Sequence, residues 1–300
     1  MTKVVVKLEN VHKKIKDNTI IHGLSFEIHE GEVYGFLGPN GSGKTTTIRM
    51  MLGLIAMTEG DITIYGHSIR TEREKALGQV GAIVENPELY GYMTGMQNLK
   101  HFANMALAPI SNEKITEMVK LAGLEQAIHK KVKTYSLGMK QRLGIAQALL
   151  HDPKILILDE PTNGLDPAGI RQIRDYLQRL AREEHITVIV SSHLLSEIEL
   201  MCDRVGIIKN GRFVQTYNLK EQVKRDDSIV VAFEVDQVQK ANEVIKGHVK
   251  ENAIIRSVTK EEIPQIVKKL VSIGVLVYSV TAQNKTLEDE FLAITGGMDA

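Results

Sequence analysis

The residues with the clearest chemical potential form one run of eight, Gly38-Pro39-Asn40-Gly41-Ser42-Gly43-Lys44-Thr45. They fit the phosphate-binding pattern G-x-x-x-x-G-K-[ST] at every fixed position. The glycines let successive backbone N–H groups approach phosphate oxygens closely. Lys44 would place a positive charge on the β- and γ-phosphates, the Thr45 hydroxyl would ligate Mg²⁺, and Thr46 would hydrogen-bond the α-phosphate. The run therefore predicts a site for a nucleoside triphosphate with Mg²⁺.

Two later apolar runs each end in polar groups that could act on such a phosphate. Residues 154–158 predict a buried parallel strand that ends at Asp159 and Glu160. Asp159 is expected to hold Mg²⁺, directly or through water, and Glu160 to take a proton from the attacking water. Residues 186–190 predict another strand, followed by His193, whose neutral imidazole could bridge the γ-phosphate and that water.

These groups can meet only if the chain folds as an α/β protein. Residues 33–37 predict a buried strand before the glycine-rich run, and residues 46–54 predict a helix after it. The positive end of that helix would point at the phosphates. Function in parallel sheets lies at the carboxyl ends of the strands, which is where all three polar groups occur.

Five motifs in this order resemble the ATP-binding subunits of ABC transporters, over roughly residues 3–217. They are the phosphate loop, residues 135–142, the strand that ends in Asp159 and Glu160, residues 163–166, and His193. The resemblance implies a P-loop NTPase fold with a RecA-like core, an antiparallel β subdomain, and a helical subdomain at about residues 88–152 that carries the signature.

The same resemblance implies how ATP is held. Two copies of the chain would pack head to tail, with ATP between the phosphate loop of one and the Ser136–Gly138 signature of the other. Asp166 would lie near the seam and couple the two sites, and His193 would sense the γ-phosphate.

The chain departs from the usual family pattern at three places. The signature is Tyr135-Ser136-Leu137-Gly138-Met139 in place of Leu-Ser-Gly-Gly-Gln, so Ser136 and Gly138 remain but the Gln is lost. Glu85 stands where the family has Gln, and a carboxylate can bind Mg²⁺ and accept a proton from water. Subunits that confer resistance to lantibiotics and bacitracin-like peptides resemble the chain in both respects. A neutral change on a solvated loop is the alternative for Glu85.

The third departure concerns the adenine end of the site. The family offers an aromatic ring before the phosphate loop, and the alignment places Ile15 at that position. Apolar contact with adenine survives there, but offset stacking does not. We therefore expect weaker discrimination among nucleotide bases.

The composition of the chain limits the kinds of partner that it can have. The 300 residues carry a formal net charge of zero and no long basic stretch, so duplex nucleic acid is not expected as a partner. Cys202 is the only cysteine, which is consistent with the cytosol. No apolar run approaches the roughly 20 residues that a membrane-spanning helix needs, and no signal peptide is expected. A separate polypeptide must then span the membrane, with this chain on its cytoplasmic face.

The middle of the chain is expected to contact that partner. Residues 98–106, 112–122 and 138–150 carry apolar positions at helical spacing. Residues 87–99 are predicted to be a loop by their Gly and Pro content, and the side chains of Leu89, Tyr90, Tyr92 and Met93 suggest a contact surface. By resemblance, the segment from Glu85 to Leu99 receives the coupling helix of an integral membrane permease. Filling of the local core is the alternative.

The ATPase pattern covers residues 1–219, and a smaller α/β accessory domain is expected at residues 228–300. Residues 219–227 read as a linker. The accessory domain is predicted to have strands at 229–235, 253–258 and 275–280, and helices at 238–245, 262–273 and 287–294, the last capped by Thr286. It shows no catalytic constellation, and a role in regulation, dimerisation or stability is expected.

The favoured interpretation is the ATP-hydrolysing subunit of a bacterial ABC exporter, acting as a homodimer with Mg²⁺ and ATP. An amphiphilic antimicrobial peptide is the expected cargo, by analogy alone. An ATPase of another transporter type, importers included, stays open. A non-transport ABC ATPase would need a coiled-coil insertion or a second ATPase unit, and a GTPase would need an Asn-Lys-x-Asp motif, neither of which is found.

Overall fold

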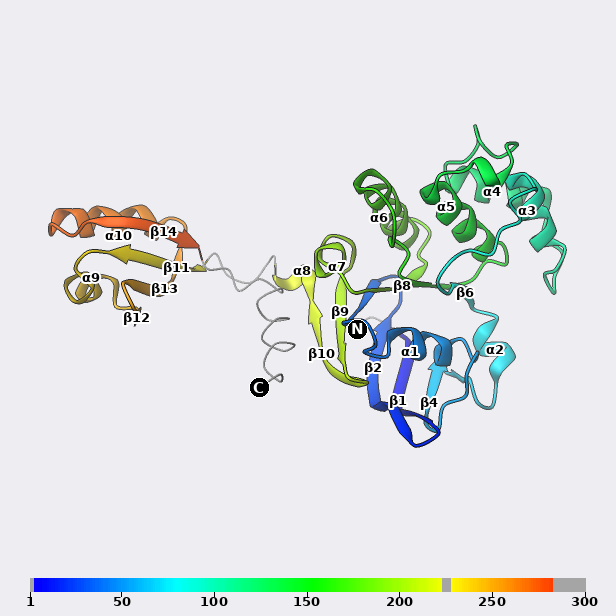
Figure 1. The fold of residues 1–300 in the computed structure, drawn as a ribbon, viewed down its shortest axis with the longest axis horizontal. Coiled ribbons are helices and arrows are strands. Elements are labelled where there is room, and N and C mark those ends of the chain that lie inside the picture. Colours follow the sequence, from blue (N-terminus) through cyan, green and yellow to red (C-terminus); the bar gives the residue numbers. More distant parts are fainter. Residues whose placement is uncertain (1–2, 223–227, 283–300) are drawn as a thin grey trace. The chain divides into compact units, whose positions relative to one another are not determined.

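The computed structural model describes residues 3–222 and 228–282 of the chain (Figure 1). It divides into two compact units, Met1–Lys220 and Glu221–Ala300. Within the described residues, none of the helices combines the length and the apolarity that a membrane span requires.

A six-stranded sheet organises the first unit, in the strand order β10-β9-β3-β8-β7-β6. Its parallel strands are β3 (Val33–Leu37), β6 (Val80–Ile83), β7 (Ile155–Asp159), β8 (Thr187–Ser192) and β9 (Arg204–Lys209), and β10 (Arg212–Asn218) runs antiparallel at one edge. Every residue of β3, β7 and β8 is buried, because both faces of the sheet are covered. These three strands are neighbours, so the segments that follow them start side by side.

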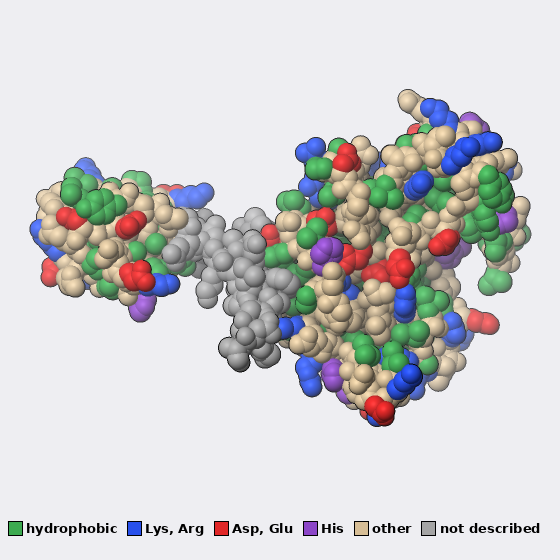
Figure 2. Space-filling view, in the orientation of Figure 1, with side chains coloured by type: hydrophobic (Ala, Val, Ile, Leu, Met, Phe, Trp, Pro, Cys, Tyr) green, Lys and Arg blue, Asp and Glu red, His purple; other side chains and the backbone are tan. Residues whose placement is uncertain are grey.

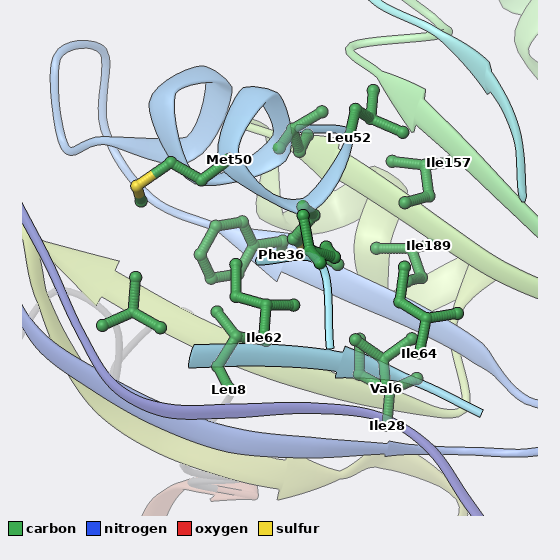
Figure 3. Close-up of a cluster of buried hydrophobic side chains, with 14 of the residues drawn as sticks. Val6, Leu8, Ile28, Phe36, Met50, Leu52, Ile62, Ile64, Ile157 and Ile189 are labelled. Atoms are coloured by element: carbon green, nitrogen blue, oxygen red, sulfur yellow. The ribbon is translucent and has the colours of Figure 1, made fainter. Parts of the chain in front are cut away.

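An antiparallel sheet in the order β2-β1-β4-β5 packs beside the first one. Its strands are β1 (Val4–Ile15), β2 (Asn18–His29), β4 (Glu59–Ile64) and β5 (His67–Ser68). One face of this sheet supplies Val6, Leu8, Ile28, Ile62 and Ile64 to a buried cluster that also contains Phe36, Ile157, Ile189, Met50 and Leu52 (Figure 3). Burying each such side chain contributes about 1.5–3 kcal/mol. The cluster therefore fixes helix α1 (Lys44–Met51) between the two sheets.

The remaining helices of this unit fall into two groups. Between β6 and β7 the chain forms α3 (Gly95–Ala103), α4 (Asn112–Leu121), the short 3₁₀ helix η1 (Val132–Thr134) and α5 (Leu137–Ala148), and Figure 1 shows α3, α4 and α5 gathered together. Helices α6 (Pro167–Arg182) and α7 (Leu195–Met201) lie on the face of the main sheet opposite α1 (Figure 1). The unit also contains the short helix α2 (Arg73–Leu77), and the short helix α8 (Leu219–Gln222) spans the boundary between the two units.

The loop predicted at residues 87–99 ends earlier than expected, since α3 begins at Gly95. Thr94 caps this helix: its hydroxyl accepts a hydrogen bond from the N–H of Gln97, and the Gln97 side chain accepts one from the N–H of Thr94. This reciprocal capping box outweighs the glycine and proline content that suggested a loop. The loop prediction is therefore wrong for residues 95–99, and the predicted helix at 98–106 starts and ends three residues too late.

The second unit is a four-stranded antiparallel sheet in the order β12-β13-β11-β14. The strands are β11 (Ser228–Val235), β12 (His248–Lys250), β13 (Ala253–Thr259) and β14 (Val277–Ala282), and the helices are α9 (Val238–Ile245) and α10 (Glu262–Ser272). The helices pack against the sheet through a buried hydrophobic core that includes Val231, Phe233, Ile245, Ile254 and Leu270. The predicted strands and the first two predicted helices are found within two residues, whereas the predicted helix at 287–294 and its cap Thr286 lie outside the described residues.

Candidate active site

The glycine-rich run forms the turn between β3 and α1 with the geometry that phosphate binding needs. Gly43, immediately before α1, has φ of 107°, in the left-handed region, and a Cβ there would lie 2.5 Å from Ile21. Only glycine fits this position without strain. No side chain caps α1, so its first N–H groups remain available to an anion at its positive end.

Lys44 is buried, and its ammonium group is held inside the loop. Its Nζ donates hydrogen bonds to the carbonyl oxygens of Gly38, at 2.7 Å, and Pro39, at 3.4 Å. It also lies 3.4 Å from Oε1 of Glu160. The ammonium group therefore already lies within the loop at the cavity wall, and phosphate oxygens can replace the two carbonyl oxygens as its hydrogen-bond acceptors.

Of the three threonines that follow Lys44, two lie at the site and one lies in the core. Thr45 and Thr46 line the cavity above the loop. Thr47 is fully buried, and its hydroxyl donates to the carbonyl oxygen of Gly43 at 2.9 Å. Its role is to hold the first turn of α1.

The predicted acids lie at the end of β7. Asp159 is buried, and its Oδ1 accepts a hydrogen bond from the Ser191 hydroxyl at 2.6 Å. Glu160 is more open to the cavity, and its φ of 52° turns its side chain away from the strand direction. The carboxylate lies between two groups, with Oε1 towards Lys44 and Oε2 at 2.7 Å from Nδ1 of His193.

The contact with Glu160 fixes how the His193 ring can act. With the carboxylate ionised, Nδ1 donates the proton, so a neutral ring presents the lone pair of Nε2 to the cavity. Protonation would convert Nε2 into a second donor. The imidazole can therefore either accept from a water molecule or donate to a phosphate oxygen.

A cavity of about 330 Å³ brings the phosphate loop together with Glu160 and His193. Its lining comprises Ile20, Asn40, Gly41, Gly43, Lys44, Thr45, Thr46, Glu160, Asn163 and His193. Two of these residues, Ile20 and Asn163, were not predicted as site residues. Ile20 is the third residue of β2, which begins directly after the β1–β2 turn, and no chemical signal in its sequence context marks it. Asn163 opens the segment 163–166 that carried part of the family resemblance.

The donor groups suit a magnesium ion that arrives with its nucleotide. Among the described residues, no group of three or more His, Cys, Asp or Glu side chains could hold a metal by itself. Mg²⁺ is commonly bound by one or two carboxylates together with substrate phosphates and water. Asp159 at the strand end and the hydroxyl of Thr45 on the cavity wall match that requirement.

The predicted signature residues lie outside this cavity. Ser136 is exposed at the N-terminus of α5, where its Oγ accepts a hydrogen bond from the N–H of Met139 at 3.2 Å. Gly138 is buried in the first turn of α5. Asp166 caps α6 by accepting from the N–H of Gly169 at 2.9 Å. None of the three lines the cavity of the same chain.

Tyr135 anchors the start of the signature. Its hydroxyl donates to the carbonyl oxygen of Ala127 at 2.7 Å. Burial raises the pKa of the Tyr135 phenol above its ordinary value, so the group stays protonated and keeps donating. Ser136 is thereby held next to a fixed neighbour.

Of the other predicted site residues, Glu85 and Ile15 lie away from the cavity lining. Four more are close in sequence to lining residues without being part of the lining: Gly38, Pro39, Ser42 and Asp159. Glu85 is exposed with φ of 67°, and its Oε1 lies 2.7 Å from Nη2 of Arg49 on α1. Ile15 is the last residue of β1, half exposed, and pairs with Asn18 across the turn. Apolar contact at the cavity itself comes from Ile20. The roles proposed for Glu85 and Ile15 stay predictions.

Comparison with known proteins agrees with this geometry. A family model described as "ABC transporter" matches residues 21–163, and one described as "AAA domain, putative AbiEii toxin, Type IV TA system" matches residues 128–199. The chain is 54% identical, over 98% of its length and 97% of the relative's, to an uncharacterized ABC transporter ATP-binding protein, YhcH, of Bacillus subtilis. The chain belongs to the ABC transporter ATP-binding proteins. Members of this family hydrolyse ATP to power transport.

Two further relatives of this ABC subunit are named for their cargo. The bacitracin transport ATP-binding protein BcrA of Bacillus licheniformis is 38% identical over 98% of both chains. The lantibiotic transport ATP-binding protein SrtF of Streptococcus pyogenes is 39% identical over 70% of this chain and 89% of its own length. The resemblance to this branch of the family is therefore confirmed.

Solved structures confirm the P-loop ATPase fold. The cbiO1 protein from Clostridium perfringens, described as part of the ABC transporter complex cbiONQ, has a TM-score of 0.68 at 30% identity, covering 74% of this chain and 91% of its own. The ATP-binding cassette MJ0796 has a TM-score of 0.62 at 27% identity, covering 71% of this chain and 98% of its own. Its structure is described as dimeric, in a post-hydrolysis state, bound to ADP and Pi.

Proposed function

We propose that two copies of this ABC ATPase clamp two ATP molecules and drive the export of an antimicrobial peptide, of the bacitracin or lantibiotic kind, through a separate membrane permease. The observation that supports the cargo class is the extent of the similarity to the bacitracin transport protein, which spans 98% of both chains and so includes the C-terminal unit. In this proposal the chain acts as a peripheral protein on the cytoplasmic face of the membrane.

The geometry of the cavity supports a mechanism in which Glu160 is the general base. Its carboxylate is held between Lys44 and His193, with one oxygen towards each. A water molecule placed against this carboxylate would lose its proton to Glu160 as it attacks the γ-phosphate. Lys44 would exchange the carbonyl oxygens of Gly38 and Pro39 for phosphate oxygens and stabilise the transferring group.

The positions of the other side chains at the site support roles for them in binding the phosphates, Mg²⁺ and the attacking water. His193 would orient the water or donate to the γ-phosphate through Nε2. Thr45 and Asp159 would hold Mg²⁺, which neutralises charge on the phosphates when it is bound. Backbone N–H groups at the start of α1 would bind phosphate oxygens, and the Thr46 hydroxyl would contact the α-phosphate.

The exposed signature supports the proposal of a second copy. Ser136 and Asp166 stand at exposed helix N-termini, away from the cavity of their own chain. The Ser136 oxygen accepts from Met139, which leaves its O–H free to donate to a phosphate held by the other copy. The N-terminus of α5 adds its positive end to the same contact.

Exposed aromatic side chains support a permease contact near residues 85–99. Tyr90 and Tyr92 are both exposed, with ring centroids 5.8 Å apart, and Tyr90 also packs on His101 and Phe102 of α3. Figure 2 shows hydrophobic side chains gathered over the α3 region. A groove of about 1040 Å³ continues from Phe102, lined by α2, residues 105–111 and residues 147–152. We propose that the permease docks on this continuous surface.

Replacing Glu85 by glutamine is expected to lower ATP turnover about tenfold, the lower end of the range seen when a group that supports a metal site is altered. Folding stability should barely change, since an exposed ion pair contributes about 0.2–1 kcal/mol. Phosphate release and thermal unfolding measure the two effects. Glu88→Gln is the matched control, because it neutralises another exposed acid of the same loop.

Arg49→Gln separates the two roles that Glu85 could have. If Glu85 acts through its ion pair, Arg49→Gln will reproduce the loss. If it acts on the metal or the water, Arg49→Gln will leave turnover close to that of the unaltered protein. Unchanged turnover in Glu85→Gln itself would show that the exchange from Gln is neutral.

The cargo is tested by growth of a susceptible bacterium that expresses the chain together with its permease. We expect a raised inhibitory concentration for one class of peptide antibiotic across a panel of bacitracin, lantibiotics and unrelated drugs. Cells that express Glu160→Gln with the same permease are the control, and they should stay susceptible. Resistance to non-peptide drugs alone, or no shift at all, would contradict the proposed cargo.

A further inference from the structure

Ser191, near the end of β8, bonds to the end of β7, where both proposed acids lie. It lies on β8 directly opposite Asp159 in the parallel pairing of β7 with β8, and it is fully buried. Its Oγ donates to Oδ1 of Asp159 at 2.6 Å and accepts from the N–H of Glu160 at 2.9 Å. One hydroxyl therefore contacts both acidic residues.

The bond to Asp159 sets the orientation of a buried carboxylate. In the described part of the chain, Ser191 is the one side chain that bonds to this carboxylate. Rotation of this carboxylate would break that bond, and leaving a buried hydroxyl group or carboxylate without its partner is costly. With Oδ1 engaged, Oδ2 is the oxygen left to face a ligand.

The bond to the N–H of Glu160 supports an unusual backbone conformation. Glu160 has φ of 52°, in the left-handed region that residues with side chains seldom adopt. Such a conformation persists only where the surroundings hold it. The Ser191 oxygen accepts the hydrogen bond from the N–H of Glu160 and so holds this backbone conformation. In this conformation the Glu160 side chain reaches Lys44 and His193.

The adjacent serine has different partners. The Ser192 hydroxyl contacts the backbone of Leu194 and the carboxylate of Glu197, which also accepts from Thr162 at 2.5 Å. Ser192 therefore bonds to the segment after β8, and Glu197 joins that segment to Thr162 in the loop after β7, whereas Ser191 contacts the two acids. The two hydroxyl groups are not interchangeable.

We propose that Ser191 is a positioning residue for hydrolysis, which aligns the carboxylate of Asp159 for Mg²⁺ and fixes the turn that aims Glu160 at the water. This inference rests on the roles proposed above for the two acids. One buried hydroxyl group would then set the positions of both the metal-binding carboxylate of Asp159 and the base Glu160.

The test replaces Ser191 by alanine in the full chain. Turnover at saturating ATP should fall about 10- to 100-fold, and the affinity for Mn²⁺, measured by electron paramagnetic resonance with a non-hydrolysable ATP analogue, should fall by a similar factor. KM for ATP should stay nearly unchanged, because Ser191 does not line the nucleotide cavity. Ser191→Thr keeps the hydroxyl and should recover much of the Mn²⁺ affinity.

Thr187→Ala is the matched control for the loss of a buried hydroxyl. Thr187 lies on the same strand and is fully buried, and its hydroxyl oxygen accepts a hydrogen bond from the N–H of Gly31 at 2.9 Å. It pairs with Ile155 at the start of β7, whereas the acids lie at the end of that strand. It should lose thermal stability comparable to that lost by Ser191→Ala and keep its Mn²⁺ affinity. Equal Mn²⁺ affinity in Ser191→Ala and the unaltered protein, or an equal loss in both alanine variants, would overturn the inference.

The Mn²⁺ measurement also separates this inference from the proposed mechanism, because it involves no hydrolysis. If Glu160→Gln kept normal turnover, the proposed base would be wrong while a loss of Mn²⁺ affinity in Ser191→Ala would still support the alignment of Asp159. If Glu160→Gln were inactive and Ser191→Ala bound Mn²⁺ normally, the positioning role alone would fail.

Discussion

Replacing Glu160 by glutamine is expected to lower ATP hydrolysis by roughly 10²- to 10⁴-fold and to leave ATP binding intact. An amide of the same shape can still lie between Lys44 and His193, but it cannot take a proton from water. The groups that would contact the nucleotide, in the loop and at the start of α1, are untouched. Hydrolysis is followed by phosphate release, and binding by the fluorescence of a labelled ATP.

The control for Glu160→Gln is Glu183→Gln, which makes the same chemical change at an exposed position after α6. It should match the unaltered protein in both assays. The Glu160→Gln variant offers a second readout, since a dimer that opens on hydrolysis should accumulate with ATP when hydrolysis is blocked. Light scattering would show this as a doubling of mass. Near-normal turnover would remove Glu160 from the role of base.

The location of the acids and the histidine could be predicted because it depends on strand order at one sheet edge. Apolar runs that end in Asp159, Glu160 and His193 predict parallel strands, and such strands bring their carboxyl ends together. The structure places Glu160 and His193 in one cavity with the phosphate loop, as expected.

The partners of those side chains could not be predicted in the same way. The contact between Ser191 and Asp159 depends on the register of two strands 32 residues apart in sequence. The pairing of Arg49 with Glu85 depends on where a loop crosses α1. Periodicity says which face of an element is buried, but it does not say which neighbour a polar group meets.

The sequence contained a signal for the start of α3, but the glycine and proline content around it suggested a loop. Thr94 and Gln97 have the spacing of a capping box, yet the surrounding glycine and proline favoured a loop, and the start of α3 was misplaced. The strand β12 has only three residues, too few for an alternating pattern to stand out. A helix end and a short strand were therefore missed for different reasons.

Replacing Lys44 by alanine is expected to weaken ATP binding itself, by about 10- to 100-fold, the range that corresponds to the loss of a charged hydrogen bond. Lys44 is buried and lines the cavity, so its charge would act on the phosphates with less screening by water and salt than an exposed charge. Its loss would also leave the carboxylate of Glu160 with His193 as its neighbour, which adds repulsion towards the incoming phosphates.

Equilibrium binding of a labelled ATP separates this result from that of Glu160→Gln. Lys120→Ala removes one positive charge from the exposed last turn of α4 and serves as the control. If Lys44→Ala bound ATP as tightly as this control but failed to hydrolyse it, Lys44 would act only on the transferring phosphoryl group. Loss of binding in Lys44→Ala, with binding kept in Glu160→Gln, would show that the loop captures the phosphates and the strand end performs the chemistry.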